Sequence, residues 1–69
     1  MPLSFANIGD SCIISRIEGR DAVVSHLNNL GFIVGETVNV VTKLAGNMII
    51  EVKGTRVALD AKLANKIYI

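Results

Sequence analysis

The most constraining feature of this sequence is an alternation of apolar and polar residues from 37 to 59, broken by glycine at two points. Residues 37–43 and 48–53 each alternate with the period of a β-strand that buries one face. Between them, residues 45–47 read Ala-Gly-Asn, and Gly and Asn tolerate the positive φ angles of a tight turn. The pattern therefore predicts a β-hairpin.

A third strand extends this hairpin into a meander. Residues 54–55, Gly-Thr, predict a second two-residue turn, and residues 56–59 alternate again. The residues expected on the inner face of the three strands are Val38, Val40, Met48, Ile50, Val52, Val57 and Leu59.

The chain before the meander predicts one strand followed by one short helix. Residues 12–17 form the strand, with Ile14 facing inward. Asp21 is placed to cap or complement the N-terminus of a helix. Val23, Leu27 and Leu30 share one helical face, Ala22 and His26 widen it, and Gly31 is placed as the stop.

The chain after the meander predicts a helical turn and a closing strand. Asp60 can cap a turn over residues 61–65, and the apolar residues 67–69 should pair with another strand, because an unpaired apolar strand invites aggregation. The fold class expected is mainly β with a short helix. It is a small SH3-like, partly open barrel of about five strands, with a helix after the first strand and a helical turn before the last.

Length and composition set further limits. A chain of 69 residues has room for a single domain, residues 1–69, and hydrophobic residues make up 51% of it, which argues against disorder. The net charge is +1 and the basic residues are dispersed, so nothing favours binding to nucleic acid or anionic membrane. The longest stretch without a charged residue, 22–35, is too short and too polar to span a bilayer.

Cysteine content and the N-terminus bear on the compartment. Cys12 is the single cysteine, so no internal disulfide can form and a reducing compartment is expected. The first residues lack a basic segment, and Asp10 interrupts any signal-peptide core. We therefore expect a soluble, cytoplasmic protein.

The segment 27–40 resembles the signature of the FeoA family: a helix ending in Leu-Gly, a few apolar residues, a glycine and a valine-rich strand. Residues 54–59, followed by Ala64 and Ile67, are similar to the closing pattern of that family. The resemblance covers nearly the whole chain. It departs at Ser25 and His26, where the family often has basic residues, and at residues 46–48, where it often has Gly-Asp-Pro.

The resemblance implies a function. FeoA-like chains are cytoplasmic accessory proteins of FeoB, a membrane ferrous iron transporter with a cytoplasmic GTPase domain. We therefore expect a regulatory or accessory protein that binds the cytoplasmic part of such a transporter and supports Fe(II) uptake. The alternative is a small-barrel RNA-binding or ribosome-associated protein. It needs a basic groove with stacking aromatics, and only three aromatics are present.

One stretch suggests where a partner binds. Residues 30–34 are apolar at a helix-to-strand connection, where loops usually carry polar side chains. The residues expected to contact the partner are His26, Leu30, Phe32, Val34 and Met48. The competing interpretation is that Phe32 and Val34 fold back to cover the open barrel, because large apolar groups are usually buried.

We expect neither catalytic nor metal-binding or cofactor-binding residues. With one His and one Cys, no nucleophile, base and orienting group can be nominated, and no phosphate-binding glycine loop exists. A metal site would have to use Cys12 and His26, which lack the spacing of a ligand set, so each is expected to serve structure or partner contact. An iron-sensing or iron-carrying protein is a third possibility that would depend on these two residues.

Overall fold

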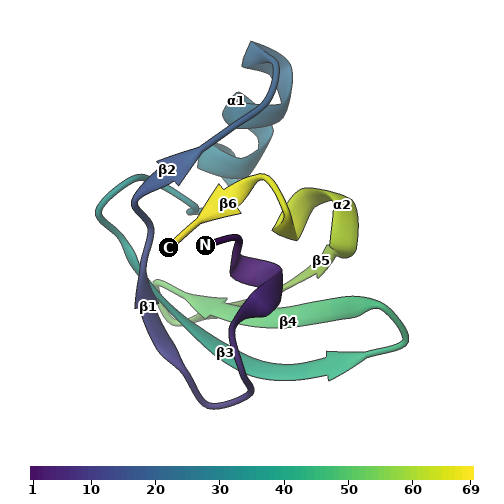
Figure 1. Cartoon of the computed structure of the whole chain (residues 1–69). Helices are drawn as coiled ribbons and strands as arrows, with labels where there is room; N and C mark the ends of the chain where they lie inside the picture. The colour runs from purple at the N-terminus through teal and green to yellow at the C-terminus, as the bar shows by residue number, and fades with distance from the viewer.

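The computed structural model describes every residue from 1 to 69. Its elements, shown in Figure 1, are η1 (Leu3–Phe5), β1 (Ser11–Ile13), β2 (Arg16–Ile17), α1 (Asp21–Asn29), β3 (Thr37–Leu44), β4 (Asn47–Val52), β5 (Thr55–Asp60), α2 (Ala61–Ala64) and β6 (Ile67–Tyr68). None of the helices has the length and apolar character needed to cross a bilayer. The fold is mainly β, as predicted.

Two antiparallel sheets enclose the core. The larger sheet has the strand order β1-β3-β4-β5, and the smaller pairs β2 with β6. The two ends of the chain lie side by side in Figure 1, because the Ile69 N–H donates to the Met1 carbonyl at 2.8 Å and Pro2 bridges to Tyr68. The expectation that the C-terminal residues pair with another strand is confirmed.

Both hairpin turns have two residues. The turn between β3 and β4 consists of Ala45 and Gly46, both with positive φ. The turn between β4 and β5 consists of Lys53 and Gly54, so the predicted turn at 54–55 is wrong by one residue. The shift arises because a lysine occupies the first positive-φ position, where its side chain gives no sign of a turn.

The predicted first strand, 12–17, is wrong as a single element. The Ile14 N–H donates to the Glu36 carbonyl next to the larger sheet, whereas the Ser15 N–H donates to the Tyr68 carbonyl of the smaller sheet. The chain thus changes sheets between Ile14 and Ser15, and each half is a short strand. The count is therefore six strands rather than about five.

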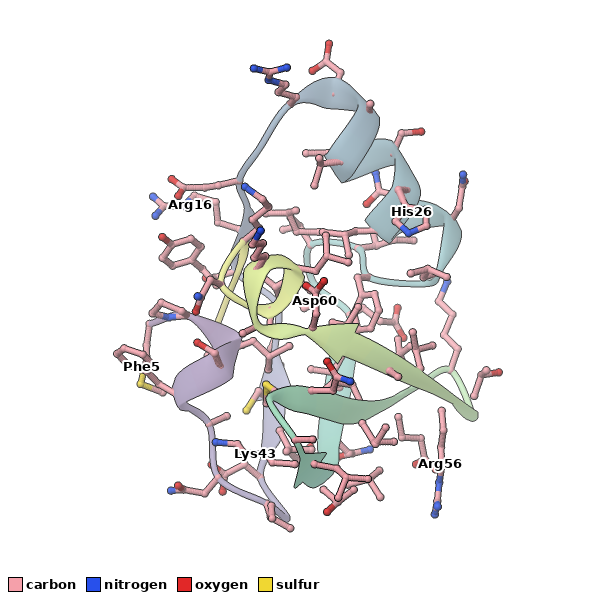
Figure 2. All side chains as sticks on the ribbon, turned by 90° about the vertical axis from the view of Figure 1, so that its right-hand side faces the viewer. Phe5, Arg16, His26, Lys43, Arg56 and Asp60 are labelled. Atoms are coloured by element: carbon pink, nitrogen blue, oxygen red, sulfur yellow. The ribbon has the colours of Figure 1, made fainter.

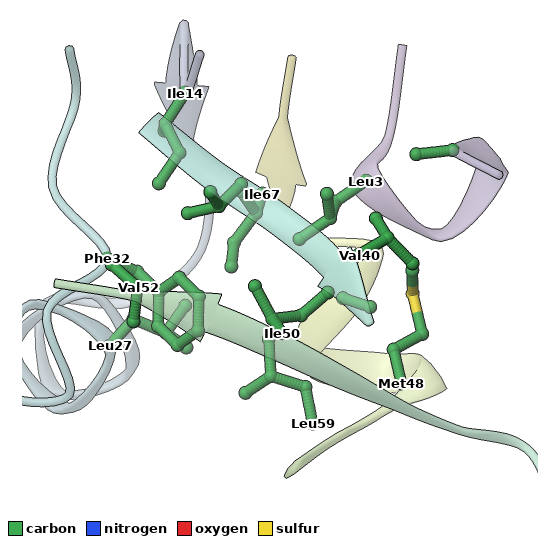
Figure 3. Packing of buried hydrophobic residues seen from close by; sticks show 13 residues of the cluster. Leu3, Ile14, Leu27, Phe32, Val40, Met48, Ile50, Val52, Leu59 and Ile67 are labelled. Atoms are coloured by element: carbon green, nitrogen blue, oxygen red, sulfur yellow. The ribbon is translucent and has the colours of Figure 1, made fainter. Parts of the chain in front are cut away.

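The core is a single cluster of 13 buried apolar residues. Figure 3 shows them packed between the sheets: Leu3, Ala6, Ile14, Leu27, Phe32, Val38, Val40, Met48, Ile50, Val52, Leu59, Ala64 and Ile67. The inner faces predicted for the meander are confirmed, except that Val57 is only half-buried. The fully buried Leu3, on the N-terminal turn η1, has no counterpart in the sequence-based prediction.

The two helices differ in how they begin. The Asp60 side chain accepts a hydrogen bond from the Leu63 N–H at 2.9 Å, which confirms it as the cap of α2. In α1 the N-cap is Arg20 and makes no side-chain cap bond, so Asp21 does not cap the helix but lies in its first turn. There a carboxylate complements the helix dipole.

Candidate docking surface

The five residues expected to contact a partner do not form one surface. Phe32 is 0% exposed and Met48 is 4% exposed, so neither side chain is available at the surface for the partner contact expected of it. Figure 3 shows them at opposite ends of the core. Met48 lies on the inner face of β4, and Phe32 is turned inward by the hydrogen bonds that end α1.

The hydrogen bonds that end α1 explain why the Phe32 side chain is buried. Gly31, at φ 105°, donates its N–H to the Asn28 carbonyl at 3.0 Å, and Phe32 donates to the Leu27 carbonyl at 3.0 Å. These two bonds make a Schellman motif, in which the residue after the glycine packs against the last turn of the helix. The interpretation that Phe32 folds back over the barrel is therefore confirmed.

Val34 behaves differently and remains 58% exposed, so the expectation that it folds back too is wrong. Next to it in sequence, Ile33 is 41% exposed, and Ile13 on β1 is 62% exposed. The two segments lie side by side, because the Gly35 N–H donates to the Ile14 carbonyl at 2.8 Å and Ile14 donates back to Glu36 at 3.0 Å. We refer to Ile13, Ile33 and Val34 as the apolar patch.

Two members of the apolar patch escaped the sequence-based prediction. Ile33 lies inside the apolar run 30–34, but its neighbours Phe32 and Val34 were the residues expected to contact the partner. Ile13 could have been found from the strand alternation, since it must point away from the core if Ile14 points into it. Exposed apolar side chains on neighbouring segments are typical of interaction sites.

His26 and Leu30 lie at the C-terminal end of α1. His26 is exposed, and Figure 2 shows its ring on the surface of the helix. Leu30 is half-buried against the core, and its N–H bonds to the His26 carbonyl at 3.2 Å. The two residues share a helical face, so His26 borders the exposed part of Leu30.

Apart from this surface, few side chains are placed for metal binding or nucleophilic chemistry. No three His, Cys, Asp or Glu side chains are grouped so that they could hold a metal ion, and the surface has no pocket. Cys12 is half-buried on β1, and burial, with a smaller contribution from the Asp10 charge, raises the pKa of its thiol. A raised pKa keeps the thiol protonated and lowers its reactivity near neutral pH.

Comparison with known proteins places the chain in a family. The FeoA domain family matches residues 1–69. A curated relative from Methanocaldococcus jannaschii, named putative Fe(2+) transport protein A, is 31% identical over 68 residues, which cover 99% of this chain and 83% of the relative. The FeoA domain belongs to proteins of ferrous iron transport and is not a known enzyme.

Solved structures agree with this assignment. The crystal structure of a FeoA protein described as an iron uptake regulatory protein matches with a TM-score of 0.87 at 33% identity, over 96% of this chain and 88% of that one. A zinc complex of Stenotrophomonas maltophilia FeoA, described as a prokaryotic SH3 domain protein, matches with a TM-score of 0.85 at 28% identity, over 99% and 87% of the two chains. The predicted SH3-like fold is thereby confirmed, and the chain belongs to the FeoA family.

Proposed function

We propose that this chain is a cytoplasmic accessory protein that binds the cytoplasmic, GTPase-containing part of a FeoB-type ferrous iron transporter and supports Fe(II) uptake. The observation that carries the proposal is FeoA family membership over the whole chain, together with an exposed apolar patch on a domain in which no side chains are grouped to hold a metal ion. The relative from Stenotrophomonas maltophilia is itself described as a candidate ferrous iron transport activating factor.

The docking site that we propose combines the apolar patch with the neighbouring end of α1. Val34, Ile33 and Ile13 offer aliphatic surface, and Leu30 and His26 lie on the helix end that leads into the same connection. Of the residues expected from the sequence, His26, Leu30 and Val34 remain in the proposal, and the buried Phe32 and Met48 belong to the core instead. A partner that covers the patch removes apolar area from water, and each Å² of apolar area buried stabilises the complex by roughly 25 cal/mol.

The patch is held rigidly, which favours binding. Its connection is tied to β1 by the reciprocal bonds of Ile14, and the Glu36 N–H donates to the Ile33 carbonyl at 2.9 Å. Because a preformed surface loses little conformational entropy on association, more of the buried area contributes to affinity.

The experiment is co-purification of the tagged full chain with the FeoB-type transporter of the same cell, in detergent, without nucleotide and with GDP or a non-hydrolysed GTP analogue. We expect the transporter to be retained in at least one of these states. The absence of association in every state would contradict the proposal.

A further inference from the structure

Strand β5 is a regular and uncovered edge of the larger sheet. It lies at the end of the strand order β1-β3-β4-β5, as Figure 1 shows, and pairs with β4 over six residues without a register shift. It contains neither proline nor a bulge, which are devices that usually protect an edge. Such an edge is a template for pairing with another strand.

The main-chain groups that are free on this edge can be identified from the register. A two-residue turn closes on a hydrogen-bonded pair, here Val52 and Thr55, and bonded and non-bonded pairs alternate along an antiparallel ladder. Thr55, Val57 and Leu59 therefore bond to β4, and the amides and carbonyls of Arg56 and Ala58 point outward. No turn or loop bond in the chain uses these groups.

The exposed face of β5 carries one charge of each sign. Arg56 and Asp60 are four residues apart and so share this face, with Ala58 between them, and all three are exposed. Figure 2 shows the Arg56 side chain extending away from the molecule, and Asp60 where β5 runs into α2. Arg56 forms no ion pair within the chain, although Glu51 stands opposite it on β4.

We propose that β5 is a self-association edge, at which two copies of this chain pair antiparallel about a two-fold axis through Ala58. In that register Ala58 faces Ala58 of the second copy, and Arg56 faces Asp60 of the second copy on both sides of the axis. A two-fold contact repeats each favourable pair, so the edge is complementary to itself. This proposal goes beyond the proposed function and does not depend on it.

The charges favour this register. Each Arg56 would stand between two carboxylates, Glu51 of its own β4 and Asp60 of the second copy, along one cross-strand row. Opposite charges directly across a strand pair are stabilising, and like charges are destabilising. Asp60 can serve this pair while capping α2, because the cap bond uses Oδ1 and leaves Oδ2.

The side chains between and beneath the charges also fit. On the outer face, Ala58 pairs with Ile49 of β4, so the small alanines would meet between two isoleucines. On the inner face, the half-buried Val57 would be covered by Leu59 of the second copy. The two larger sheets would then continue into one another, and Arg56 and Ala58 would gain main-chain partners.

The test is a charge exchange on the full chain, read by sedimentation velocity over a concentration series. We expect the unaltered chain to dimerise with rising concentration. We expect Arg56→Glu and Asp60→Lys each to weaken dimerisation on the order of tenfold, because two attractive pairs become repulsive. An equimolar mixture of these two variants should dimerise again. In a mixed pair the carboxylate introduced at position 56 faces the ammonium introduced at position 60, and the remaining Asp60 faces the remaining Arg56.

Arg20→Glu is the matched control for Arg56→Glu, because it makes the same change of net charge on the exposed N-cap of α1. It should leave dimerisation unchanged. Asp60→Lys also removes the cap of α2 and can destabilise the fold. A second measurement therefore uses the unaltered chain, in which amide exchange at Ala58 should slow as the protein concentration rises. A chain that stays monomeric at millimolar concentration, or a mixture that associates no better than its components, would overturn the proposal.

Discussion

The Phe32 N–H donates to the Leu27 carbonyl at 3.0 Å, and the side chains of both residues are fully buried. This pairing joins the end of α1 to the core and decides which residues of the following connection are exposed. With Phe32 turned inward, the next two residues, Ile33 and Val34, come to the surface as part of the apolar patch.

Gly31 makes this geometry possible, so Gly31→Ala should destabilise the fold. Its φ of 105° lies where side chains are strained, although a Cβ would meet Val52 only at an ordinary 3.5 Å. The cost is therefore conformational, about 1–3 kcal/mol of unfolding free energy. Urea denaturation measures it. Gly31→Asn is the control and should cost less, because Asn tolerates positive φ. An alanine variant as stable as the parent would refute this explanation.

The first positions of the two hairpin turns should accept a stabilising change. Ala45 and Lys53 both have φ of 51°, and each precedes a glycine. Asn-Gly is the preferred pair for such turns, so Ala45→Asn and Lys53→Asn should each add about 1 kcal/mol. Thermal unfolding of the single variants and the double variant would show whether the gains add. No increase in Tm for either variant would contradict the turn assignment.

The cap of α2 predicts a loss on truncation. Asp60→Ala removes the acceptor of the Leu63 N–H and should lower the unfolding free energy by about 1 kcal/mol. Asp60→Ser keeps a capping oxygen, so its unfolding free energy should stay close to that of the parent chain. The measurement is the denaturant midpoint of the parent chain, Asp60→Ala and Asp60→Ser, compared where the dependence of the unfolding free energy on denaturant has the same slope. Equal losses in both variants would mean that the carboxylate acts otherwise than as a cap.

Cys12 should make the fold sensitive to alkaline pH. Burial, followed by the Asp10 charge, raises the folded-state pKa of the thiol above the unfolded one. The folded state therefore favours the protonated thiol, and its contribution to stability is complete below the unfolded pKa and lost as pH rises through the folded pKa. Cys12→Ala should abolish this alkaline slope, measured by denaturation at several pH values, and Asp10→Asn should reduce it. An unchanged slope in Cys12→Ala would exclude the thiol as its cause.

Much of this fold could be predicted from the sequence, because those parts depend on interactions between residues that are close together in the chain. The meander followed from two-residue alternation and the positive-φ turns, and α2 followed from its Asp60 cap. The change of sheets after Ile14 could not be predicted, because it depends on partners far away in the sequence at Glu36 and Tyr68. The burial of Leu3 was missed for a related reason: a three-residue turn has no periodicity to detect.

The docking site that we propose matches the sequence-based expectation only in part. The apolar run 30–34 indicated a surface, but a Schellman motif turns one member of such a run inward and leaves others outside, and the sequence shows only the glycine. Ile13 joins the patch through the hydrogen bonds of its neighbour Ile14, which no local pattern encodes. The partner itself was inferred from family resemblance, since composition favours no particular one.

The most direct test of the central claim is the dissociation constant between the full chain and its FeoB-type transporter, measured with Val34→Asp and Leu44→Asp. Val34 is 58% exposed in the apolar patch, and Leu44 is 68% exposed at the opposite end of β3. We predict that Val34→Asp weakens binding tenfold or more, on the order expected of a central contact, while Leu44→Asp binds like the parent chain. Unaltered binding by Val34→Asp, or an equal loss in both variants, would contradict the account.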